Sequence, residues 1–199
     1  KCSADVNHIR LHGAVGEAPV YSHLNHGVEF YTFPLVVRRL SGAEDQVNVV
    51  APLELLECCG PLERESELTV LGEVRTFNNR TGVGSRLVIS AFARELRQEP
   101  GEDENRLELS GTLCKTPSLR ATPLGRTICD MILAVNRRYG RADYLPCIAW
   151  GSLAHRCGGM EVGDQLRLTG RLQSRTYTKV SGDRSEERVA FEVSIMSLA

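Results

Sequence analysis

The sequence predicts an all-β protein built from two similar five-stranded barrels in tandem. Shifting the 199-residue chain by 98 positions aligns Gly13 with Gly111 and Gly72 with Gly170, each inside a similar apolar stretch. Apolar residues around these glycines alternate with polar ones, which is typical of strands that bury one face. Each copy has the length of one small domain, so the repeat predicts two domains rather than one.

The second copy marks its elements more clearly than the first. Its first strand contains Gly111, which indicates a bend or bulge, and a loop with two prolines follows at 116–125. A basic turn at 136–141 joins the second and third strands, and a short helix at 151–157 ends at two glycines. The five strands are expected at 107–113, 127–135, 144–150, 165–177 and 189–195.

The first copy repeats this order, with a helix expected at 53–59. Its strands are expected at 9–15, 28–37, 47–51, 68–77 and 87–92. Five strands with one short helix between the third and the fourth describe the OB-fold, a small barrel that commonly binds oligonucleotides. The domains are expected at 1–98 and 106–199. Residues 99–105 form an acidic linker between them, because this stretch is rich in Glu and Asp and cannot build a core.

The charge of the chain is unevenly distributed. The formal net charge is only -1, yet residues 106–199 hold 14 Lys and Arg against 9 Asp and Glu. The first half is therefore acidic, and the second half is the better candidate for binding a polyanion. The Gly-rich phosphate loop, the HExxH metal helix and the GxSxG nucleophile turn are all missing, so the sequence indicates no enzyme.

The seven cysteines favour a reducing compartment. Their number is odd and no CxxC pair occurs, which argues against a zinc ribbon and a disulfide framework. His8 with His12 and His23 with His26 have spacings that suit a metal, but no third ligand completes either pair. No apolar run approaches the ~20 residues of a membrane span, and no signal-peptide core is seen. We expect a soluble cytoplasmic protein, associated with the nucleoid, that needs no metal and no cofactor.

Four aromatic rings of the second copy lie close to basic residues in the sequence. Tyr144 and Trp150 are six residues apart on one expected strand and therefore point to the same face, Tyr139 lies in the basic turn, and Tyr177 ends the fourth strand. Unpaired bases stack on exposed rings while cations bind phosphate, so this combination predicts a surface for single strands. Rings on strands also often belong to the core, and that alternative stays open for each. The cationic candidates are Arg137, Arg138, Arg171, Arg175 and Lys179.

The stretches LSGTLCKTPSLRATPLG, LAVNRRY, IAWGSLA and LRLTGRLQSRTY follow one another within 106–196. In this order they resemble the bacterial-type single-stranded DNA-binding proteins. The resemblance implies that the strand passes along Tyr139, Tyr144, Trp150 and Tyr177. It also implies that Arg120 and Arg175 are basic contact positions.

The sequence departs from that family in two ways. Family members typically end in an acidic, hydrophobic tip that recruits replication and repair enzymes, whereas this sequence ends in SIMSLA. Recruitment through such a tip is therefore in doubt, and replication and repair proteins stay open as partners. Most members also carry one OB-fold per chain and assemble four. By analogy, a chain with two barrels is expected to form a homodimer.

The first copy serves as an internal control for the rings. The positions 98 residues before the four rings hold Ser41, Gln46, Pro52 and Asn79, and none of these has a ring. We therefore expect the first domain mainly to complete the assembly and extend the basic path, and the second to supply most of the stacking. The remaining candidates in the first copy are Phe77, Arg75, Arg38 and Arg39.

The expected function is sequence-tolerant binding and protection of single-stranded DNA in replication, recombination and repair. The alternative is an OB-fold module of the primosome type, which mainly contacts other proteins and binds nucleic acid weakly. Quenching of the fluorescence of Trp150, the only tryptophan, by oligo-dT separates the two.

Overall fold

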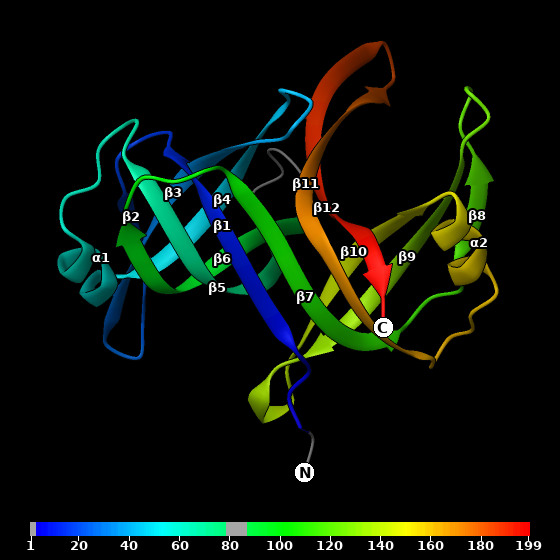
Figure 1. The fold of residues 1–199 in the computed structure, drawn as a ribbon, viewed down its shortest axis with the longest axis horizontal. Helices are drawn as coiled ribbons and strands as arrows, with labels where there is room; N and C mark the ends of the chain where they lie inside the picture. Colours follow the sequence, from blue (N-terminus) through cyan, green and yellow to red (C-terminus); the bar gives the residue numbers. More distant parts are fainter. Residues whose placement is uncertain (1–2, 79–86) are drawn as a thin grey trace. The chain divides into compact units, whose positions relative to one another are not determined.

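Within the described residues, 3–78 and 87–199, the computed structural model forms strands joined by turns and two short α-helices (Figure 1). The chain divides into two compact units. One contains residues 8–75 and 89–106, and the other contains residues 3–7, 76–78, 87–88 and 107–199. We call them the first and the second barrel, after the closed sheet that each contains.

The first barrel closes through its first strand. The strands pair in the order β2-β3-β4-β6-β5-β1, and β1 pairs again with β3, where Ala14 lies opposite Val36. The β4 and β6 strands run parallel, and the other neighbours with a described register are antiparallel. The elements are β1 (Asn7–Val15), β2 (Val20–Asn25), β3 (Val28–Arg38), β4 (Glu44–Pro52), α1 (Leu53–Cys59), β5 (Glu67–Asn78) and β6 (Leu87–Gln98).

The second barrel repeats this plan. Its order is β7-β11-β12-β10-β9-β8, with a closing contact between β7 and β9 and a parallel pair of β10 with β12. A single 3₁₀ turn, η1 (Arg138–Gly140), lies between β9 and β10. The elements are β7 (Glu104–Leu113), β8 (Ser118–Ala121), β9 (Thr127–Asn136), β10 (Ala142–Trp150), α2 (Ser152–Gly158), β11 (Gln165–Ser181) and β12 (Arg184–Leu198).

Each barrel has one strand more than the five expected. The extra strands are β2 and β8, and each forms a hairpin with the strand that follows it. Every residue of both is exposed, so neither shows the alternation that marks a strand with one buried face. The prediction of a loop throughout 116–125 was therefore wrong for the residues of β8. Pro117 precedes β8 and Pro123 lies in the turn after it, so neither proline removes a hydrogen bond from the ladder.

The glycines that revealed the repeat lie where two strands nearly touch. A Cβ atom at Gly13 would collide with the carbonyl oxygen of Val36, and one at Gly111 would lie 2.5 Å from that of Ala134. Gly170 has the same relation to Ser194, and the register of β11 with β12 shifts beside it. Barrel closure therefore requires glycine at these positions, which explains why both copies keep it.

The acidic stretch at 99–105 folds back onto the first barrel. The buried ring of His12 bonds through Nε2 to the carbonyl oxygen of Glu99 at 2.9 Å, and the backbone N–H of Arg38 donates to Asp103 at 2.8 Å. Arg10 donates to Glu104 at 2.9 Å. The stretch is thus held by basic residues of the first barrel rather than solvated along its whole length.

The described cysteines are free thiols, and three of them, Cys129, Cys147 and Cys157, are buried. No helix of the described residues is long and apolar enough to cross a bilayer. The same residues contain no group of three or more His, Cys, Asp or Glu that could hold a metal ion.

Burial is expected to divide the thiols into two reactivity classes. It raises the pKa of Cys129 to about 11 and raises the pKa of Cys147 as well, so neither forms the reactive thiolate at neutral pH. Cys58 and Cys114 are exposed. A Cys2→Ser variant treated with an aromatic disulfide reagent should label Cys58 and Cys114 within minutes and Cys129 and Cys147 only in denaturant. Rapid labelling of Cys147 in the native protein would contradict this assignment.

Candidate nucleic-acid interface

One side of the strand β10 faces the core of the second barrel, and the other side faces outward. Asp143, Leu145 and Cys147 point inward and are buried, so Tyr144 and Trp150 point outward. Paired residues on neighbouring strands share a face, and Trp150 pairs with Ile128, which pairs in turn with Arg120. Across β12 and β11, Ile148 pairs with Ser194, and Ser194 pairs with Arg171. We define the outer face by these alternate residues of β8, β9, β10, β12 and β11, of which Ile128, Ile148 and Ser194 are themselves buried.

All four predicted rings reach solvent. Tyr139 is 98% exposed in η1, where its positive φ of 69° turns the chain outward. Tyr144 is 54% exposed, and Trp150 and Tyr177 are half-buried. Tyr144, Trp150 and Tyr177 lie on strands, and none of them belongs to the fully buried core. The rings therefore keep surface on which a base could stack.

Trp150 has a cationic neighbour that the sequence pattern did not single out. The guanidinium of Arg126 lies 4.7 Å from the centre of the indole ring, within the range of a cation–π contact. Arg126 precedes Ile128 by two residues, and Ile128 pairs with Trp150. The pairing of β9 with β10 is the signal that places the two side chains together, and it is not visible in the sequence alone.

The predicted cations differ in what they contact. Arg120 donates from Nε to Asp130 at 2.5 Å, and Nε of Arg175 lies 3.7 Å from the Glu192 carboxylate. Arg138 and Lys179 are exposed, and Arg171 is half-buried. Arg137 donates two hydrogen bonds, at 2.6 and 2.5 Å, to the fully buried carboxylate of Asp143. Its guanidinium is thus engaged inside the barrel, where it fixes the turn before β10.

The first barrel repeats that internal ion pair but not the rings. Arg39 donates to Asp45 at 2.8 and 2.7 Å, and both residues lie 98 positions before Arg137 and Asp143. Asn79 lies outside the described residues. Ser41, Gln46 and Pro52 have no ring, as read from the sequence.

The other first-copy candidates have defined places. Phe77 is exposed and belongs to the compact unit that contains the second barrel. Arg38 donates to Glu44 at 3.1 Å, and Arg75 donates to Glu73 at 2.7 Å. Burial disfavours the charge of Glu73, but the hydrogen bonds and charges of Arg94 and Arg75 outweigh it and lower its pKa.

A cluster of rings on the first barrel was missed in the sequence. His23 stacks on Phe30 with ring centres 4.9 Å apart, and Phe30 lies 5.6 Å from Phe92. The guanidinium groups of Arg75 and Arg94 lie 3.8 and 5.0 Å from the centre of the Phe92 ring. The available signal was the alternation in β3, where Phe33 is buried and Phe30 therefore points to the other side.

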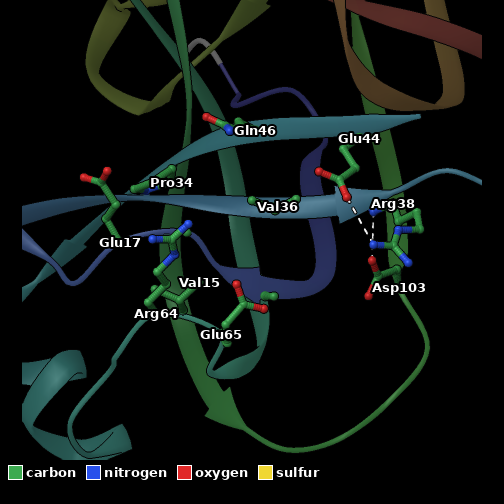
Figure 2. A pocket seen from close by; sticks show the side chains of 12 residues that line it. Val15, Glu17, Pro34, Val36, Arg38, Glu44, Gln46, Arg64, Glu65 and Asp103 are labelled. Carbon is green, nitrogen blue, oxygen red and sulfur yellow. Dashed lines mark hydrogen bonds and ion pairs between the residues drawn. The ribbon is translucent and has the colours of Figure 1, made fainter. Parts of the chain in front are cut away.

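Near Gln46, the first barrel has a hollow of about 390 Å³ with an acidic lining (Figure 2). Glu17, Glu44, Glu65 and Asp103 contribute carboxylates, against the guanidinium groups of Arg38 and Arg64. Figure 2 shows Arg38 between Glu44 and Asp103. An excess of carboxylates repels phosphate, so this end of the first barrel is poorly suited to a nucleic-acid backbone.

Comparisons with known proteins find similarity to single-stranded DNA-binding proteins. A model of the single-strand binding protein family matches residues 104–198, which covers β7 to β12. The chain is 36% identical over 101 residues to a single-stranded DNA-binding protein of Clostridium tetani, covering 46% of this chain and 70% of that protein. It is 34% identical over 87 residues to single-stranded DNA-binding protein 2 of Listeria innocua, covering 40% of this chain and 55% of that protein.

A solved structure matches both barrels. The wild-type single-stranded DNA-binding protein of Thermus aquaticus superposes with a TM-score of 0.77 at 23% identity, covering 99% of this chain and 93% of that one. This likeness confirms the predicted fold of two tandem OB-folds, each with one short helix. The family follows from the sequence identity to the Clostridium protein, which extends over most of that protein's length, and from the family model. The chain belongs to the bacterial-type single-stranded DNA-binding protein family.

Proposed function

We propose that this protein binds single-stranded DNA, largely independently of sequence, on the outer face of the second barrel. Bases stack on Tyr139, Tyr144, Trp150 and Tyr177 while the basic side chains beside them bind phosphate. The observation that carries the proposal is on β10, where Tyr144 and Trp150 point away from the core and stay accessible. The relatives named single-stranded DNA-binding proteins support it.

The two domains, at 1–98 and 106–199, divide the work in this proposal. The second supplies most of the stacking, and the first extends the basic path and completes the assembly. The acidic hollow is lined by Gln46, which stands at the position of Tyr144 in the second copy. The hollow supports the smaller share of the first barrel in stacking, and the proposed basic path does not run along it. The assembly is a homodimer with four barrels, which protects unpaired strands in the cytoplasm during replication, recombination and repair. No chemical step and no cofactor are involved.

Trp150 provides the test, because it is the only tryptophan and lies on the outer face. Titrating micromolar protein with oligo-dT should quench its fluorescence, and a duplex of the same length should quench it far less. If about four phosphates per chain are neutralised, log affinity should fall with log salt with a slope near -3. Absence of quenching, or an affinity that does not change with salt, would contradict the proposed function.

A further inference from the structure

Two carboxylates lie among the cations of the outer face. Asp130 on β9 accepts a hydrogen bond from Arg120, and Glu192 on β12 lies 3.7 Å from Arg175. In the pairing of β12 with β11, Glu192 lies opposite Gln173, and Arg175 lies opposite Ala190, two residues before Glu192. These side chains share one face, the same one that carries Ser194 and Arg171.

We propose that Asp130 and Glu192 hold Arg120 and Arg175 back from DNA phosphate and so limit the affinity of the outer face for single strands. The inference rests on the proposed function, because it concerns the regulation of that same surface. A phosphate that approaches either arginine must compete with a carboxylate already in place, and it is repelled by the same charge.

The surroundings of Glu192 fit competition better than a structural role. The residue is only 7% exposed, and burial raises the pKa of its carboxyl more than the charge of Arg175 lowers it. Its carboxylate lies 3.7 Å from Nε of Arg175, which is longer than a hydrogen bond. The pair of Arg137 with Asp143, by contrast, has two short hydrogen bonds to a fully buried carboxylate. The Glu192 charge is therefore unfavourable where it lies, and losing it removes little support from the fold.

The charged groups around Glu192 come from three strands. They are Arg120 on β8, Asp130 on β9 and Arg175 on β11. Arg171, also on β11, has a buried Nε that finds no hydrogen-bond partner among the described residues. A bound phosphate would bring acceptor oxygens to a face where cationic donors are otherwise taken by carboxylates.

The test compares Glu192→Gln with Glu187→Gln, which also removes one negative charge from β12. Glu187 is exposed and lies opposite Thr178, an odd number of residues from Glu192, so it points to the other face of the hairpin. Binding of labelled oligo-dT, followed by fluorescence polarisation, should tighten roughly three- to tenfold in Glu192→Gln and change less than about twofold in Glu187→Gln. The salt slope should steepen by about 0.7, because one more phosphate is neutralised.

A second readout uses pH. As pH falls, protonation of Glu192 removes its charge in the wild type, and because burial raises the pKa of this carboxyl, this happens at a higher pH than for an ordinary glutamate. The advantage of Glu192→Gln should therefore shrink as the pH is lowered. All other titratable groups are the same in both proteins, so their effects cancel in the ratio of the two affinities. Asp130→Asn, at a half-buried position, should tighten binding as well, and it decides the question if Glu192→Gln does not fold.

The outcomes separate this inference from the proposed function. A wild type that fails to bind oligo-dT overturns the proposed function and the inference with it. A wild type that binds, with Glu192→Gln and Asp130→Asn no tighter than Glu187→Gln, overturns the inference alone. Weaker binding of both variants would mean that the carboxylates position the arginines for DNA, which also overturns it.

Discussion

Replacing Trp150 and Tyr177 together by alanine is expected to weaken oligo-dT binding at least about thirtyfold. Stacking contributes ~1–3 kcal/mol per base, so the loss of two platforms costs ~2–6 kcal/mol. Both rings are only half-buried on strands of the second barrel, so their truncation removes binding surface rather than a fully buried core contact. Polarisation of a labelled strand measures the loss, since the double variant has no tryptophan to report it.

The matched control removes two rings contributed by the first copy. Tyr21 and Phe77 are both exposed, so Tyr21→Ala with Phe77→Ala takes away as many rings with little effect on folding. We expect this pair to weaken binding less than about threefold, because the first copy of the repeat supplies little of the stacking. Equal losses in the two double variants would refute the proposed division of work between the two copies.

The sequence could predict those parts of the fold that have one buried face. Strands such as β11 alternate between buried and outward residues, as the sequence pattern indicated. For Tyr144 and Trp150 the spacing predicted only that the two rings share a face, and their access to solvent comes from the structure. The same reasoning failed for β2 and β8, where both faces are exposed and no alternation exists. The cluster of His23, Phe30 and Phe92 was missed because one of its two ring contacts, His23 on Phe30, depends on β2, although the alternation in β3 indicated the direction of Phe30.

The sequence could not show which cations are already engaged. Arg120 and Asp130 are ten residues apart, and only the hairpin of β8 with β9 brings them together. Arg175 and Glu192 meet in the same way through β11 and β12. A list of basic residues therefore overestimates the charge that is ready to bind phosphate. One signal was available, because Arg39 with Asp45 recurs as Arg137 with Asp143 at the spacing of the repeat.

The ion pair that recurs in both barrels is expected to contribute strongly to stability. Asp143→Ala is expected to lower the free energy of unfolding by ~3–5 kcal/mol, because it leaves the partly buried guanidinium of Arg137 without its carboxylate. Asp45→Ala should do the same in the first barrel, where the guanidinium of Arg39 is equally enclosed, with 25% of its side chain exposed against 24% for Arg137. Urea unfolding followed by circular dichroism measures both.

An exposed ion pair is the control for the two Asp variants. Arg38 and Glu44 lie 3.1 Å apart with 66% and 48% of their side chains exposed, so Glu44→Gln should change stability by less than ~1 kcal/mol. If the two Asp variants lose no more than this, the buried pairs only offset their own desolvation. The arginines would then be held too weakly to fix the turn between the second and third barrel strands, and Arg137 would again become a candidate for binding phosphate.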